Sequence, residues 1–123
     1  MKKLLLTALL CFCVNAHAFN WVKVGEIVND RIPVYVDVDN ISKRNGLVYY
    51  WSLHDDPSTT SSTIYKLKAD CIEERVVLMT LTGYNQPMGK GKITLSHAPD
   101  VFHYPQPKTS MYLGMKYACD RAK

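Results

Sequence analysis

Beyond its N-terminal segment, the sequence has no long hydrophobic run and little excess charge. Lysine plus arginine (15) exceed aspartate plus glutamate (11) by only four in 123 residues. A bilayer-spanning helix needs about 20 consecutive apolar residues, and no segment after residue 18 provides them, so we expect no membrane span. A nucleic-acid-binding protein concentrates positive charge on one surface, and so small an excess predicts no nucleic-acid partner.

Motifs for catalysis and cofactor binding are also missing. The sequence has no G-x-S-x-G nucleophile elbow. The stretch "GYNQPMGKGK" (83–92) resembles a phosphate-binding loop, but Gly91 follows Lys90 where that motif needs a hydroxyl. The histidines and methionines show no metal-ligand spacing. We therefore expect no enzyme, no cofactor and no metal, and we interpret 83–92 as a hairpin connection.

The N-terminus has the three parts of a secretory signal. Lys2 and Lys3 precede a short apolar run (4–14), and small residues follow at Ala16-His17-Ala18. We expect residues 1–18 to be a signal peptide and 19–123 to be one exported domain, periplasmic, secreted or on the cell surface. Loss of two lysines lowers the net charge from +4 to +2. No small residue precedes Cys11 or Cys13, so a lipid anchor is not expected.

Two cysteines remain in the expected mature chain, Cys71 and Cys119. In an exported protein such a pair most simply forms one disulfide, and two free thiols or half of a metal site are the alternatives. A bridge closing 119 − 71 = 48 residues would stabilise the fold by about 4 kcal/mol on the chain-entropy model.

Alternating apolar and polar residues predict short strands separated by turns. The expected strands are 20–24, 33–38, 47–55, 63–71, 75–84 and 91–98. Segment 41–46 is expected to be a turn because it ends in Asn45-Gly46, and the polar segment 56–62 a loop.

The last part of the chain predicts a helix. Prolines in 103–110 exclude a central strand there. Ser110 is a candidate cap for a helix to about Asp120, with Met111, Met115 and either Ala118 or Cys119 on one stripe. We expect an α+β domain in which one antiparallel sheet of about six strands carries a single C-terminal helix, tethered to one sheet face by the disulfide.

A basic and aromatic surface is the main candidate for binding. Lys66 and Lys68 share one face of a predicted strand, and tyrosines 35, 50 and 84 are expected nearby. An ordinary solvated sheet face explains the same pattern equally well. The candidate partner-binding residues are Lys66, Lys68, Arg75, Tyr84, Lys90 and Lys92. The outward side of 47–55 is rather apolar and leaves room for a homodimer interface.

Several segments together resemble a known family. They are Trp21, "VYVDVDNIS" (34–42), "YWSL" (50–53), "ADC" (69–71), "GYNQPMGKGK" and the final cysteine. This order is similar to the surface-adhesin protein E family of exported bacterial proteins. The resemblance covers essentially the whole mature chain.

The resemblance implies an antiparallel sheet with a C-terminal helix held by a Cys71–Cys119 disulfide. It also implies an adhesin that contacts host matrix or serum proteins and is able to dimerise. The name-giving member is a lipoprotein, whereas no suitable lipid-attachment cysteine exists here. The leading hypothesis is a non-enzymatic, exported, adhesin-like binding module. The second is a periplasmic accessory or structural subunit of an envelope complex.

Overall fold

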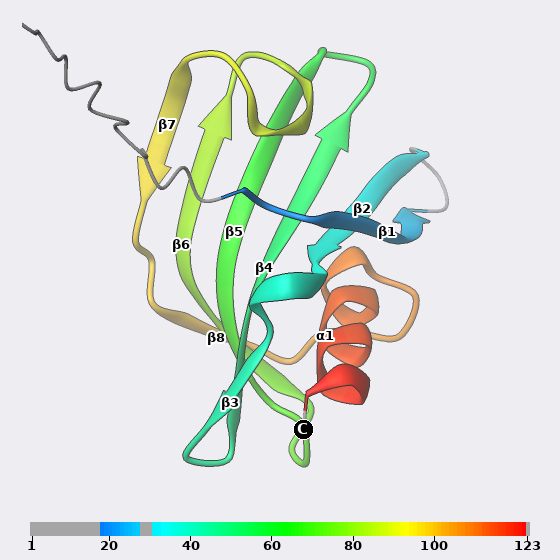
Figure 1. Cartoon of the computed structure of the whole chain (residues 1–123), viewed down its shortest axis with the longest axis vertical. Coiled ribbons are helices and arrows are strands. Elements are labelled where there is room, and N and C mark those ends of the chain that lie inside the picture. The colour runs from blue at the N-terminus through cyan, green and yellow to red at the C-terminus, as the bar shows by residue number, and fades with distance from the viewer. Residues whose placement is uncertain (1–17, 28–30, 123) are drawn as a thin grey trace, which may run out of the picture.

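Three long antiparallel strands form the centre of the structure. The computed structural model describes residues 18–27 and 31–122, so the predicted signal peptide lies outside the described residues except for Ala18. The central strands are β4 (Leu47–Asp56), β5 (Ser61–Asp70) and β6 (Arg75–Tyr84). Each pairs with the next along nearly its full length (Figure 1). The connections are tight, and the residues Thr60 and Glu74 adopt positive φ angles of 54° and 52° in them.

Interrupted strands flank the central three on both sides. On one side, β2 (Ile32–Asp37) and β3 (Ser42–Arg44) pair with successive parts of β4, and the short helix η1 (Val38–Asn40) separates them. On the other side, β7 (Ile93–His97) and β8 (Val101–His103) pair with successive parts of β6. Pro99 lies in the gap, where it cannot donate a ladder hydrogen bond. β1 (Trp21–Ile27) extends the sheet beyond β2, which gives the order β1-β2-β4-β5-β6-β7.

The six predicted strands are confirmed, but β8 was not predicted and two other segments differ locally. The path of six strands and the bounds of 75–84 agree with the sequence pattern. The segment 41–46, expected to be only a turn, also contains β3, because Asn45 and Gly46 (φ 52° and 81°) form a two-residue hairpin turn. The expected loop 56–62 is shorter, since Ser61 and Ser62 already pair in β5.

The two sheet faces have different surroundings. We call the face that packs against the helix the inner face and the opposite one the outer face. Inner-face side chains and two helix residues form the main core cluster, which consists of Val36, Val48, Tyr50, Leu67, Ala69, Val76, Leu78, Met115 and Ala118. Tyr50 is 1% exposed, so it belongs to this core and the expectation that it joins the binding surface is wrong.

The C-terminal helix α1 (Ser110–Arg121) covers part of the inner face (Figure 1). Met115 and Ala118 are buried and Met111 and Cys119 pack beside them, which confirms the predicted stripe. The cap is not Ser110, because Thr109 accepts the hydrogen bond from the Tyr112 N–H at 3.2 Å through its Oγ1. A residue with β-region backbone angles fits the cap position, and Thr109 has them.

The disulfide between Cys71 and Cys119 fastens α1 to the end of β5. Their Cα atoms are 5.9 Å apart, which confirms the expected pair over free thiols or a metal half-site.

The glycine-rich stretch is the predicted hairpin connection. It folds back over the outer face near the start of β5, the end away from the disulfide. There the short helix η2 (Pro87–Gly89) is held by Ser62, whose Oγ accepts the Gly89 N–H at 2.8 Å.

Candidate functional site

Three of the predicted binding residues lie together on the outer face. Lys66 and Lys68 alternate along β5, and Arg75 begins β6 directly opposite Asp70. Tyr84 lies on the same face but pairs with Ser62, about 20 Å along β5 from Lys68 at 3.3 Å per residue. Lys90 and Lys92 are exposed beside Tyr84, in the connection between β6 and β7. The structure therefore brings Lys68 and Arg75 together at one end of the outer face and places Tyr84, Lys90 and Lys92 toward the other end, with Lys66 between them.

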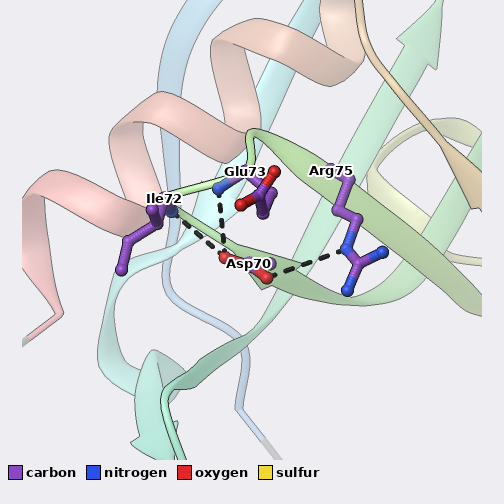
Figure 2. Close-up of polar contacts among 4 residues, drawn as sticks. All are labelled: Asp70, Ile72, Glu73 and Arg75. Atoms are coloured by element: carbon purple, nitrogen blue, oxygen red, sulfur yellow. Dashed lines mark hydrogen bonds and ion pairs between the residues drawn. The ribbon is translucent and has the colours of Figure 1, made fainter.

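Asp70 organises the turn that leads to Arg75. Its Oδ1 accepts hydrogen bonds from the backbone N–H groups of Ile72 (3.2 Å) and Glu73 (3.1 Å), as Figure 2 shows. Its other carboxylate oxygen lies 3.7 Å from Arg75 Nε. A carboxylate that accepts from the backbone two and three residues later stabilises a tight turn. The same residue thus shapes the turn that begins at Cys71 and orients a cation on the outer face.

Arg75 borders a groove that we call the Arg75 groove. Its volume is about 270 Å³, and it is lined by Leu47, Lys68, Asp70, Arg75, Val77, Asp100 and Phe102. The Arg75 guanidinium carbon lies 5.0 Å from the centre of the Phe102 ring. This distance is within the range of cation–π attraction, so the guanidinium contacts both an aromatic ring and the carboxylate of Asp70.

Two more cation–aromatic pairs lie on the outer face. Arg44 lies 4.0 Å from the centre of the Tyr49 ring, and the Lys66 ammonium lies 5.3 Å from that of Trp51. Cross-strand pairing explains the second pair, because Trp51 and Lys66 are direct partners. We call the three pairs Arg44–Tyr49, Lys66–Trp51 and Arg75–Phe102 the cation–aromatic row. Sequence reasoning missed Arg44, although the alternation of 47–55 already placed Tyr49 and Trp51 on one face.

A second groove lies at the opposite end of the outer face. It has a volume of about 500 Å³ and is lined by Phe19, Trp51, Ile64, Thr80, Thr82, Tyr84, Ser96, His97 and Ala98. Phe19 stacks on Trp21 with ring centres 4.7 Å apart and meets Trp51 edge-on at 5.6 Å. Tyr84, the predicted aromatic contact, therefore contributes to this groove rather than to the Arg75 groove.

The edge formed by β7 and β8 is exposed and apolar. Every residue of β7 is exposed, including Ile93 (62%) and Leu95 (47%). The same edge continues with Val101 (48%) and Phe102 (58%), and Tyr104 (63%) follows. Val101 and Phe102 point to opposite faces of the sheet, so the edge exposes apolar side chains on both faces rather than as one patch.

The described part of the chain contains no group of three metal-ligating His, Cys, Asp or Glu side chains. Among the same residues, none of the helices has the length and hydrophobicity needed to cross a bilayer.

Comparison with known proteins agrees with the sequence resemblance. The family model described as "Surface-adhesin protein E" matches residues 21–120. The chain belongs to this family. No curated protein matches the sequence. Membership supports a surface adhesin, an exported protein that binds other proteins.

Solved structures of Haemophilus influenzae protein E are similar to this family member. One has 18% sequence identity, a TM-score of 0.56, and covers 81% of this chain and 83% of its own. Its selenomethionine form has 17% identity and the same TM-score, with 81% and 85% covered. Crystal form II has 19% identity and a TM-score of 0.53, with 71% and 80% covered. At these identities the likeness shows the fold, an antiparallel sheet with one C-terminal helix.

Proposed function

We propose that the protein is an exported, non-enzymatic binding module, adhesin-like, that contacts host extracellular matrix or serum proteins through its outer face. The observation that carries this proposal is the cation–aromatic row. Three cations, each held against an aromatic ring, lie on one face that α1 leaves uncovered. Family membership supports the adhesin class, and the row supplies a surface on which a protein partner would bind.

The row has the composition of a protein-binding surface. Arginine, tyrosine and tryptophan are enriched where protein interfaces bind most strongly. A guanidinium already held against a ring loses less conformational freedom when a partner binds, and this lowers the entropic cost of association. Arg44, Lys66, Lys68 and Arg75 outnumber the nearby Asp70 and Asp100. A partner with acidic side chains around an apolar centre therefore fits this face best.

Binding of the mature chain to a panel of immobilised matrix and serum proteins tests the proposal. The double variant Lys66→Ala/Arg75→Ala should weaken the strongest interaction at least tenfold, and raising the salt concentration should weaken it further. Lys116→Ala is the matched control, because Lys116 is an exposed cation on α1. Equal affinities for the double variant and wild type would exclude the outer face as the contact.

Lys90 and Lys92 remain candidates for a second part of the contact. Both are exposed beside the groove that Tyr84 lines. In the variant Lys90→Glu/Lys92→Glu, charge reversal should slow association with an acidic partner more than it speeds dissociation. Surface plasmon resonance measures both rates. Unchanged association with every tested protein would remove the two lysines from the site.

We propose that residues 1–18 are cleaved and that the protein reaches the cell surface without a lipid anchor. The Cys71–Cys119 disulfide supports export, because such bonds persist in oxidising compartments. Protease treatment of intact cells, followed by N-terminal sequencing of the released protein, tests this proposal. A wholly protease-protected pool would favour the second hypothesis, a periplasmic accessory subunit.

We further propose that two copies associate through the edge of β7 and β8. The exposed apolar residues there, Ile93 and Leu95 among them, support a homodimer. Light scattering after size exclusion gives the mass in solution. Leu95→Lys should convert a dimer to a monomer, and a wild-type monomer at all concentrations would disprove association.

A further inference from the structure

The groove that Tyr84 lines, which we call the Tyr84 groove, crosses the outer face from β4 to β7. Its centre is a row of paired residues from three strands, Ile64 of β5, Thr82 of β6 and Ser96 of β7. Thr80 and Tyr84 lie on either side of Thr82 along β6. The volume, about 500 Å³, falls within the range of about 300–1,000 Å³ that is typical of small-molecule sites.

Two β-bulges bound the part of the sheet that forms this groove. The pairing of β6 with β5 shifts register at Met79, and its pairing with β7 shifts register at Thr94. A bulge bends its strand and increases the local twist, and bulges are frequent beside binding sites. We attribute the hollow to this bend, because segment 80–84 lies between the two bulges.

The hydroxyl groups of the groove are available to a ligand. Those of Thr80, Thr82 and Ser96 form no hydrogen bond with another described residue. Ser62, on the same face of β5, instead donates its hydroxyl to the Gln86 carbonyl at 2.6 Å. A hydroxyl both donates and accepts hydrogen bonds. The three hydroxyls therefore suit a ligand whose own polar groups also do both.

The groove combines these hydroxyls with an available aromatic ring. Trp51 already lies against the Lys66 ammonium at 5.3 Å and meets the Phe19 ring at 5.6 Å. Tyr84, in contrast, pairs with no ring or cation in the described part of the chain. The face of an aromatic ring is electron-rich and attracts weakly positive C–H groups. The Tyr84 ring is thus the apolar contact that a ligand would use.

Charge distinguishes this groove from the Arg75 groove. The described lining of the Tyr84 groove contains no aspartate, glutamate, lysine or arginine, whereas four charged residues line the Arg75 groove. A charged group that entered the Tyr84 groove would lose hydration without gaining a counter-charge. The lining therefore favours a neutral ligand that carries both C–H faces and hydroxyls.

We propose that the Tyr84 groove binds a neutral saccharide. The C–H face of one sugar ring lies against Tyr84, and the sugar hydroxyls pair with Thr80, Thr82 and Ser96. A proline-rich segment also docks in aromatic-lined grooves, but its prolines offer carbonyl acceptors and no N–H donors, so it matches the three hydroxyls less well. This inference goes beyond protein binding at the cation–aromatic row, with which the groove shares only Trp51.

Titration of the ¹⁵N-labelled, oxidised mature chain with lactose, cellobiose and maltose tests the proposal. Any tag belongs at the C-terminus, because Phe19 borders the groove. Backbone signals of 80–84 and 96–98 should shift saturably, and those of α1 should not. An open groove and a small ligand limit the dissociation constant to about 1–10 mM. Glucuronate should bind at least threefold more weakly than methyl glucoside, its neutral counterpart.

Three outcomes of the titration would overturn the proposal. The first is the absence of saturable shifts with all three disaccharides, and the second is shifts centred outside the groove. The third is saturable shifts from a decaproline peptide and none from the sugars, which would assign the groove to proline-rich segments.

Two variants separate the hydroxyl contact from the ring contact. Thr82→Val keeps the shape and removes one hydroxyl, and we expect about a fivefold loss of affinity for the disaccharide that binds best. Tyr84→Leu removes the ring, and the expected loss is also about fivefold. Thr94→Val and Tyr49→Leu are the matched controls, because neither residue lines the groove. Wild-type affinity in both groove variants would overturn the assigned contacts.

A last variant makes failure of this inference distinguishable from failure of the adhesin proposal. Arg75→Ala alters the cation–aromatic row and leaves the lining of the Tyr84 groove intact. It should therefore bind the disaccharides as the wild type does. A loss of saccharide binding in Arg75→Ala would place the sugar at the row and overturn the assignment to the Tyr84 groove.

Discussion

The two faces of the same sheet use aromatic and polar residues in opposite ways. On the inner face, Tyr50 and Ser52 are buried under α1, which is covalently fixed by Cys119. On the outer face, Tyr49 and Trp51 are partly exposed and each is paired with a cation. Adjacent residues of one strand thus have different roles, because successive side chains point to opposite faces. The comparison teaches that α1 closes part of the inner face, whereas the cation–aromatic row on the outer face is accessible and available for recognition.

Loss of the disulfide, which fixes α1 to the inner face, should cause the largest loss of stability. The double variant Cys71→Ser/Cys119→Ser removes a link between residues 48 apart, and we expect about 4 kcal/mol less free energy of unfolding. Urea denaturation measures this loss. Binding at the outer face under native conditions should persist while the domain stays folded. Loss of binding in a folded double variant would contradict the independence of the two faces.

Protonation of His54 on the inner face should make the stability of the protein depend on pH. Its pKa is about 4 in the folded state against 6.5 ordinarily, so the unfolded chain binds the extra proton first as pH falls. The contribution of neutral His54 to the free energy of unfolding is fully present above pH 6.5. It should decrease by an amount of the order of 3 kcal/mol between pH 6.5 and 4.

Chemical denaturation at several pH values, compared with His54→Gln, isolates this contribution. The variant should show a flatter dependence between pH 6.5 and 4. His97→Gln is the control, because His97 is exposed on β7 and should leave the dependence unchanged. Parallel curves for wild type and His54→Gln would show that His54 titrates normally.

Gly89→Ala should lower the free energy of unfolding of the protein by about 1–3 kcal/mol, through contacts on the outer face. Gly89 has a φ of 71°, and an added Cβ would lie 2.7 Å from Ile64 Cδ1. Both the backbone conformation and the contact are unfavourable for alanine. Thermal unfolding monitored by circular dichroism measures the effect. An unchanged melting temperature would show that the loop over β5 does not contribute to stability.

Gly114→Ala should instead stabilise the protein, by about 0.5–1 kcal/mol. Gly114 lies inside α1, and the nearest atom to an added Cβ would be at an ordinary contact distance of 3.6 Å. Alanine favours a helix more than glycine does. The same denaturation assay compares this variant with Gly89→Ala. A lower stability for Gly114→Ala would indicate that the inner face is packed more tightly than the structure shows.

Arg75→Ala should have the smallest effect on stability, within about 0.5 kcal/mol. Its ion pair with Asp70 is partly exposed and 3.7 Å long, and such pairs contribute little to folding. The variant thus separates recognition from stability. A loss above about 1 kcal/mol would show that the contacts of Arg75 with Asp70 and Phe102 also stabilise the fold.

Local signals in the sequence predicted much of the fold. The bounds of β6 follow from its β-branched residues and the turn signals beside it, and the stripe of α1 follows from the spacing of Met111 and Met115. Lys66 and Lys68 were found because alternation alone places them on one face. The pair Arg44–Tyr49 was missed, because the partner of a side chain depends on strand register.

The gap between β7 and β8 limits how far a neighbouring chain can pair with this edge of the sheet. β7 offers five consecutive residues at the open edge, and β8 offers three beyond the break at Pro99. Continuous strand addition, the route by which sheets grow into fibres, requires a longer uninterrupted edge. The break therefore limits strand addition at this edge of the sheet.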